Sequence, residues 1–283
     1  MIAPLLAYVP PMTLDFSEDE IERYSRHILL GEVGGMGQER LRQASVLVVG
    51  AGGLGSPLLL YLAAAGVGRI GLVDDDVVSL SNLQRQIAHT TARIGMAKVE
   101  SAAKAAREVN PLVAVEQHRL RLGPANALDL ISRYDIVCDG TDNFASRFLL
   151  ADACVLARRT LVSAAVLRFE GQLSVFKPHA GGPCYRCLYP EPPPPGLVPS
   201  CAEAGVLGAV TGVMGTLQAT EVLKEILGIG ESLAGSVLIW DALAGRMRKV
   251  RLRPDPDCPA CGTHPRITDL SAHTEPEGPA CAR

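Results

Sequence analysis

The chain has 283 residues, a length that suits one large α/β domain or two small ones. Hydrophobic residues make up 48% and aromatic residues only 4%, so Val, Leu, Ile and Ala must fill the core, as they do between parallel strands and Ala-rich helices. The net charge of −3 lacks the basic excess of a nucleic-acid-binding protein, and no apolar run reaches the ~18 residues of a membrane span.

The N-terminal region is expected to begin with a disordered leader over residues 1–12, because three prolines interrupt this stretch and it lacks the basic start of a signal peptide. Residues 17–30 then show the period of an amphipathic helix. Ser17 is followed by Glu20 three residues later, which predicts a capping box at the start of this helix.

The β-branched run at 45–49 predicts a strand, and a glycine-rich turn follows it directly. A helix over 56–65 and a second strand over 69–74 complete a β-α-β unit. The turn lets backbone N–H groups approach a phosphate at a helix N-terminus, and Asp74 and Asp76 end the second strand, where carboxylates bind ribose hydroxyls. The pattern favours a nucleotide site over a tight turn without a ligand. Its glycines are Gly50, Gly52, Gly53 and Gly55.

The remaining pattern predicts an α/β fold of the Rossmann type, with a mostly parallel sheet, flanking helices and an antiparallel C-terminal extension. A loop is expected over 181–200, where a proline run excludes helix and central strand. Helices are predicted at 96–109, 124–133, 144–157 and 205–227, and strands at 113–117, 134–139, 161–166, 172–176, 237–241 and 247–252.

Polar residues that follow the strands at 69–74 and 134–139 favour an ATP site over a dinucleotide site. Asn82, Arg85 and Lys98 follow the ribose carboxylates, and adenylyl transfer needs cations beside the phosphates, whereas a dehydrogenase does not. Asp142 and Asn143 follow the strand at 134–139, where a carboxylate can hold Mg²⁺. The same two residues also suit the N-cap of the next helix, and both readings can hold for one loop.

Two CxxC pairs predict a closed four-thiolate zinc site that is structural, with two redox motifs as the alternative. No export signal accompanies the cysteines, which favours metal binding in a reducing cytosol over disulfides, and thus a cytoplasmic protein. The metal would tie the loop near 184 to the C-terminal region. The four residues are Cys184, Cys187, Cys258 and Cys261.

These motifs resemble, in order and over roughly residues 17–262, the MoeB/ThiF family, bacterial relatives of ubiquitin-activating enzymes. The segments that carry the resemblance are Arg23-Tyr-Ser-Arg26, Gly50-Ala-Gly-Gly-Leu-Gly55, Asp74-Asp-Asp76, Ser79-Leu-Ser-Asn-Leu-Gln-Arg-Gln86, Gly95-Met-Ala-Lys98, Asp139-Gly-Thr-Asp-Asn143, Glu170-Gly-Gln172, Cys184-Tyr-Arg-Cys187 and Cys201-Ala-Glu-Ala-Gly205.

The resemblance implies ATP-dependent adenylylation of the C-terminal Gly-Gly carboxylate of a ubiquitin-like sulfur carrier, MoaD-like or ThiS-like, by a homodimer. Asp74 and Asp76 would serve the ribose, and Asp142 would place Mg²⁺. Arg26 would reach the partner subunit's ATP. The triphosphate would be held by Asn82, Arg85 and Lys98.

One adenylyltransferase domain is expected over 13–262, followed by a polar tail at 263–283 without a rhodanese domain, so a separate cysteine desulfurase or rhodanese would donate sulfur. Cys201 lies near a predicted helix start, which lowers a thiol pKa, and is either a covalent or sulfur-relay residue or an ordinary loop cysteine. The carrier's pathway stays open between molybdopterin, thiamine and tRNA thiolation. The rival functions are a nicotinamide-dependent dehydrogenase and a zinc-stabilised binding scaffold.

Overall fold

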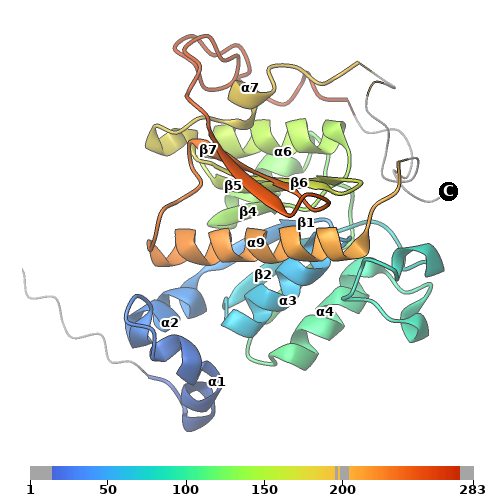
Figure 1. The fold of residues 1–283 in the computed structure, drawn as a ribbon, viewed down its shortest axis with the longest axis vertical. Coiled ribbons are helices and arrows are strands. Elements are labelled where there is room, and N and C mark those ends of the chain that lie inside the picture. The colour runs from blue at the N-terminus through green and yellow to red at the C-terminus, as the bar shows by residue number, and fades with distance from the viewer. Residues whose placement is uncertain (1–14, 195–196, 198–203, 275–283) are drawn as a thin grey trace, which may run out of the picture.

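An eight-stranded sheet forms the centre of the molecule in the computed structural model, which describes residues 15–194, 197 and 204–274 (Figure 1). The strand order is β3-β2-β1-β4-β5-β6-β7-β8. The neighbours from β3 to β5 are parallel, and those from β5 to β8 are antiparallel. The strands are β1 (Ser45–Val49), β2 (Arg69–Val73), β3 (Ala114–His118), β4 (Ile136–Asp139), β5 (Thr160–Leu167), β6 (Glu170–Phe176), β7 (Ser236–Asp241) and β8 (Arg246–Arg251).

Helices cover both faces of the parallel half of the sheet, so its inner strands carry apolar residues on both sides, and every residue of β1 is buried. The edge strand β3 is mostly exposed. One core lies between the sheet and α3, α4 and α9, and the other between the sheet and α5, α6 and α7. The helices are α1 (Glu18–Ile28), α2 (Gly34–Gln43), α3 (Gly55–Ala65), α4 (Lys98–Val109), α5 (Ala127–Ser132), α6 (Phe144–Leu156), α7 (Tyr185–Leu188) and α9 (Gly208–Leu227).

The order of the parallel strands places a switch point between β1 and β4. From β1 the chain winds outward through β2 to β3, and it then returns to β4 on the other side of β1. The loops after β1 and β4 therefore leave the sheet side by side, which is where open α/β sheets bind ligands. The contact is close: a Cβ on Gly50, whose φ is +97°, would lie 2.8 Å from the carbonyl oxygen of Gly140.

Most predicted elements are present, including the capping box, in which Ser17 Oγ accepts from the Glu20 amide and the Glu20 carboxylate accepts from the Ser17 amide. The α-helices α2 and α7 were not predicted. Helix α2 begins without a side-chain cap and is held by packing, with Leu41 buried. Helix α7 lies inside the expected loop at 181–200 and is a single turn. In the described residues, no helix has the length and apolarity of a membrane span.

Candidate active site and metal centre

A cavity of about 160 Å³ opens at the C-terminal ends of β1, β2 and β4, bordered by the glycine loop. Gly52 faces open space, since a Cβ there would meet only the Gln86 side chain at 3.8 Å, and Gly53 lies against Thr211. Gly50 and Gly55 serve packing instead: a Cβ on Gly55 would overlap the Gly50 carbonyl. The loop thus presents bare backbone to the cavity, as phosphate binding requires.

The two carboxylates at the end of β2 have different partners. Asp74 accepts hydrogen bonds from the amides of Ala51 (2.8 Å) and Asp76 (2.9 Å), so it fixes the glycine loop to β2. Burial raises the pKa of Asp74, while the nearby Lys98 charge and these amide donors oppose that rise. Asp76 is more exposed and pairs with Lys98 Nζ at 2.8 Å. Both carboxylates border the cavity.

The cavity has a cationic side. Lys98 and Arg85 border it, and Arg85 donates to the Ser81 carbonyl at 3.1 Å. The Oε1 atom of Gln86, another lining residue, is buried and has no hydrogen-bond partner among the described residues. A polyanionic ligand with hydroxyl donors suits such a lining. Asn82 does not border the cavity: it is buried, and its Oδ1 accepts from the Ser79 amide in the turn Leu80–Asn82.

The loop after β4 forms the wall opposite these cations. Asn143 caps α6 by accepting from the Ser146 amide at 2.8 Å, which confirms the N-cap reading of this residue. Asp142 is exposed and borders the cavity. Arg147, one turn into α6, donates to the Thr141 carbonyl at 2.8 Å and also borders the cavity. A carboxylate and a guanidinium therefore stand at the same edge.

A second cavity, of about 220 Å³, adjoins the first. It lies over β5, β6 and β7 and is lined mainly by apolar and aromatic residues, among them Phe144, Leu173 and Tyr189. The two cavities share four lining residues, so they meet at the loop after β4. The shared residues are Asp142, Asn143, Arg147 and Val166.

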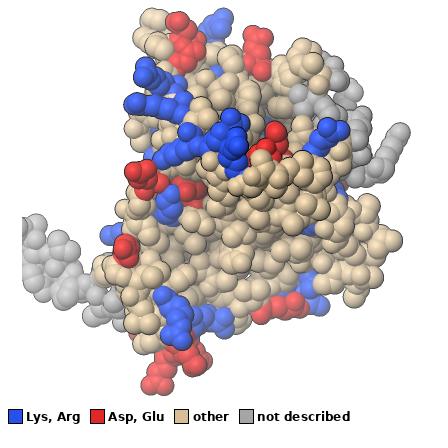
Figure 2. Space-filling view, viewed as in Figure 1, with Lys and Arg blue, Asp and Glu red and all other residues tan. Residues whose placement is uncertain are grey.

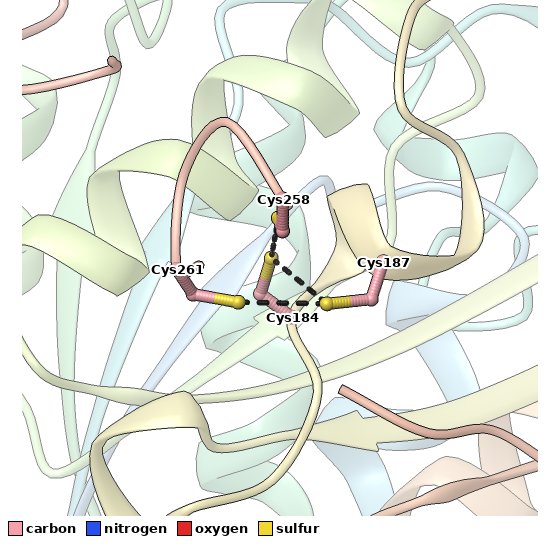
Figure 3. A group of neighbouring side chains, drawn as sticks. All are labelled: Cys184, Cys187, Cys258 and Cys261. Carbon is pink, nitrogen blue, oxygen red and sulfur yellow. Dashed lines mark hydrogen bonds between the residues drawn. The ribbon is translucent and has the colours of Figure 1, made fainter. Parts of the chain in front are cut away.

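The two CxxC pairs come together, although they lie far apart in the sequence (Figure 3). Cys184 and Cys187 come from the region of α7, and Cys258 and Cys261 from the loop after β8. Their Sγ atoms are 3.5 Å apart for Cys184–Cys258 and for Cys187–Cys261, and 3.9 Å apart for Cys184–Cys187. Four thiolates at Zn–S bond length in a tetrahedron lie about 3.8 Å apart, so the cluster fits zinc.

Comparison with known proteins places this architecture in a family. The model of the ThiF family matches residues 24–260. The chain belongs to the ThiF family. It is 58% identical over 263 residues to the "Adenylyltransferase and sulfurtransferase MOCS3" of Bos taurus, covering 93% of the chain but only 57% of that relative. It is 51% identical over 259 residues to the "Sulfur carrier protein adenylyltransferase" of Thermus thermophilus, covering 90% of the chain and 96% of the relative.

Solved structures agree on the fold. The crystal structure of Escherichia coli MccB with ATP matches with a TM-score of 0.75 at 22% sequence identity, over 84% of this chain and 74% of the other. At this identity the likeness supports the ThiF-type architecture, including the mostly parallel sheet with its antiparallel end. It carries no assignment of individual residues.

Like Asn82, the predicted site residue Arg26 stands apart from the cavities of this ThiF-family chain. Arg26 lies exposed on α1 and does not border either cavity, and no ion pair joins it to Glu22 in the described chain. Cys201 lies outside the described residues. Its role, like that of Arg26, stays a prediction.

Gln86, His89 and Arg147 were not predicted as site residues from the sequence. Gln86 and Arg147 line the nucleotide-type cavity, and His89 contacts the glycine loop through the Ala51 carbonyl at 2.9 Å. Gln86 and His89 follow Arg85 closely, and Arg147 follows Asp142 by five residues. This closeness in the sequence to predicted site residues was the signal that could have identified them. A single polar residue on a helix or strand, however, more often has a structural role.

Proposed function

We propose that the chain is an ATP-dependent adenylyltransferase that activates the C-terminal Gly-Gly carboxylate of a ubiquitin-like sulfur-carrier protein. The observation that carries this proposal is the meeting of two unlike cavities at the loop after β4. One has a glycine loop, cations and carboxylates suited to ATP, and the other is an apolar chamber suited to an extended peptide. The names of the Bos taurus and Thermus thermophilus relatives support the same activity.

In the proposed reaction, a carboxylate oxygen of the carrier attacks the α-phosphorus of ATP. The new O–P bond forms as the bond between the α-phosphorus and the bridging oxygen breaks, and pyrophosphate leaves with that electron pair. The product is a mixed anhydride, carrier-AMP. The terminal sulfur of a donor persulfide then attacks its acyl carbon as AMP leaves, and a second thiol reduces the resulting acyl disulfide to the carrier thiocarboxylate while it forms a disulfide with the donor. A separate cysteine desulfurase or rhodanese is the proposed donor.

The lining residues fit the groups of ATP. The bare glycine loop suits the phosphates, Lys98 and Arg85 suit their charge, and Asp76 suits the ribose hydroxyls. Asp142 would hold Mg²⁺, which prefers oxygen ligands and supplies charge neutralisation at the phosphates. Charge builds on the pyrophosphate as it leaves, so fixed cations beside it lower the barrier.

The second cavity suits the end of the carrier. Two terminal glycines carry no side chains, so an extended Gly-Gly tail can pass between the walls and bring its carboxylate to the shared edge. The aromatic and apolar lining, which includes Tyr185, Leu188 and Tyr189, then suits the residue that precedes the glycines. Zinc at the four cysteines would have a structural role, because four thiolates leave no open coordination position.

Carrier-dependent exchange of pyrophosphate into ATP tests the proposal. The wild-type chain should catalyse this exchange with one or more recombinant carriers that end in Gly-Gly, from a panel of MoaD-like and ThiS-like proteins. Asp142→Ala should lower the exchange rate by about 100-fold or more while the fold is kept, because the metal loses its carboxylate ligand.

Asp129→Ala is the matched control, since Asp129 is an exposed carboxylate on α5 that forms an ion pair with Arg133 and borders neither cavity. It should retain wild-type exchange. Near-full exchange by Asp142→Ala would remove Asp142 from the active site. No exchange with any carrier, together with nucleotide binding, would favour a binding scaffold instead.

A further inference from the structure

Arg147 stands where the two cavities meet. It borders both, and it is the only cation among the four residues that do so. Its side chain is 12% exposed. The glycine loop and cations of the nucleotide cavity lie on one side of it, and the apolar chamber proposed for the carrier tail lies on the other. This inference therefore deepens the proposed function and rests on it.

Contacts with Thr141, Asp139 and Tyr185 hold the guanidinium of Arg147 at this edge. One Nη atom donates to the Thr141 carbonyl at 2.8 Å, and Nε lies 4.0 Å from Oδ2 of Asp139. Asp139 is itself fully buried, and it accepts from the Thr141 hydroxyl (2.7 Å) and the Ser163 hydroxyl (2.8 Å). A guanidinium has five N–H donors in a planar fork, so these contacts leave donors for a ligand.

We propose that Arg147 is a catalytic residue that binds the incoming carboxylate of the carrier and aims one of its oxygens at the α-phosphorus of ATP. A carboxylate that enters the site meets a triphosphate of the same charge, and a cation at the boundary offsets this repulsion. A guanidinium can also grip a carboxylate through two parallel hydrogen bonds, which fixes its orientation. Asp139 behind the guanidinium keeps the fork in place.

The competing explanation is structural: Arg147 would only anchor the loop after β4 through Thr141 and Asp139. The two roles predict different kinetic effects. An anchor of this loop affects ATP binding and stability, because the loop also borders the nucleotide cavity. A carboxylate receptor affects the KM for the carrier and leaves ATP binding unchanged.

The experiment compares Arg147→Gln and Arg147→Lys with the wild-type chain. Binding of Mg·ATP is measured by calorimetry, binding of the carrier that supports exchange in the wild type is measured separately, and exchange is followed against carrier concentration. We expect Arg147→Gln to raise the KM for the carrier about 30-fold or more, with the dissociation constant for Mg·ATP changed less than about twofold. Arg147→Lys should recover part of the loss, because it restores the charge without the fork.

Arg159→Gln is the matched control. Arg159 follows the opposite end of α6 and likewise donates to a backbone carbonyl, that of Ser132 at 2.6 Å, but it borders neither cavity. It should leave both constants unchanged. Added guanidinium ion should also restore exchange in Arg147→Gly, since the small cation can enter the space of the missing side chain.

The proposal is overturned if Arg147→Gln weakens Mg·ATP binding as much as carrier binding, or if the KM for the carrier stays at the wild-type value. The proposed function can fail separately. If the wild type binds a Gly-Gly carrier through Arg147 but exchanges no pyrophosphate, adenylylation is wrong and the carboxylate receptor stands. In that case, binding is measured with the same panel of MoaD-like and ThiS-like carriers. If Arg147→Gln binds every carrier with the same affinity as the wild type, the inference is overturned.

Discussion

His89 contacts the glycine loop from within the core. It is 6% exposed, its Nε2 lies 2.9 Å from the Ala51 carbonyl, and its Nδ1 lies 2.9 Å from Oγ of Ser101 on α4. A carbonyl only accepts, so Nε2 carries the proton and Nδ1 of the neutral ring accepts from the Ser101 hydroxyl. Burial lowers the pKa of His89, and the nearby charges of Lys98 and Arg93 lower it further. The neutral ring therefore joins the glycine loop to the helix that carries Lys98.

Replacing His89 by Gln should remove a pH dependence of stability. The unfolded chain titrates this group near pH ~6.5, and the folded chain at lower pH, so the unfolded state binds more protons in that window. Wild-type stability should thus fall as the pH drops through about 6.5 toward 5. The His89→Gln variant should be less stable than the wild type by about 1 kcal/mol at pH 7.5. Its free energy of unfolding should then fall less than that of the wild type when the pH is lowered. Urea unfolding at pH 7.5 and 5.5 measures both.

The comparison isolates His89, although burial also lowers the pKa values of His118 and His179. Both of those residues are present in wild type and variant, so their effects cancel in the difference. Parallel loss of stability in the two proteins would show that His89 does not titrate differently in the folded state.

The segment after the second CxxC pair behaves as part of the fold. Leu270 is 4% exposed and packs in the core of α5 and α6. His273 Nε2 lies 2.8 Å from Oδ2 of Asp152 on α6, and Asp152 also accepts two hydrogen bonds at 2.8 Å from Arg186, which lies between Cys184 and Cys187. Burial alone would raise the pKa of Asp152, but the hydrogen bonds and charges of His273 and Arg186 hold this pKa below its usual value. Asp152 on α6 thus links this segment, through His273, to the cysteine cluster, through Arg186.

Truncating Leu270 to Ala should lower the free energy of unfolding by about 2–5 kcal/mol, because it leaves a cavity between the segment and α6. Zinc bound at the four cysteines should also pass faster to a chelator, since the loop that carries two of them is less firmly held. Denaturant unfolding and a chelator dye measure the two effects. Leu243→Ala is the control: Leu243 is 76% exposed, so its change should stay within about 0.5 kcal/mol.

Equal stability and equal zinc release in Leu270→Ala and Leu243→Ala would mean that the segment is only loosely attached. A loss of stability without faster zinc release would separate the segment's packing from the metal site.

On the whole-molecule scale, the middle of one face carries few charges. Figure 2 shows the middle of this face, where α9 and α3 lie in Figure 1, largely without Lys, Arg, Asp or Glu. Tyr61 on α3 is 54% exposed and Val213 on α9 is 37% exposed. A region with few charges and with exposed apolar residues on neighbouring helices suits a subunit interface, which is consistent with the proposed homodimer.

Mixing two inactive variants tests the dimer and Arg26 together. Arg26 lies exposed on α1 and away from the cavities of its own chain, so we expect it to act on the ATP of the partner subunit. Arg26→Ala and Asp142→Ala should each be nearly inactive, but their mixed dimer contains one site with both residues intact. Exchange activity should return to at most half the wild-type value for each mixed dimer.

If Arg26 acts in its own subunit, each chain carries its own defect and mixing restores nothing. Sedimentation at the assay concentration provides the control for assembly. A monomeric wild-type chain that is fully active would end the proposal for Arg26.

The local sequence was sufficient for the features that depend on neighbours in the chain. The capping box at Ser17, the strand and glycine turn at 45–55 and the CxxC spacing are short-range patterns, and the structure contains each of them. The parallel strands and the two antiparallel hairpins β5–β6 and β7–β8 also followed, because parallel neighbours need a long crossover and a short turn reverses the chain. The antiparallel pairing of β6 with β7 did not follow, since helix α9 separates these two strands. Helix α2 and the buried Leu270 did not follow, since each is held by packing rather than by a local signal.

The division of work inside the site was decided by the tertiary structure. Asp74 and Asp76 look alike in the sequence, yet the fold uses one to fix the glycine loop and leaves the other beside Lys98. Arg147 is an ordinary helix residue until the switch point brings β1 and β4 together and places it between two cavities. Residue types and spacing set which chemistry is available to the chain. Which atoms meet depends on contacts between segments far apart in the sequence, and only the packed sheet and its helices fix those.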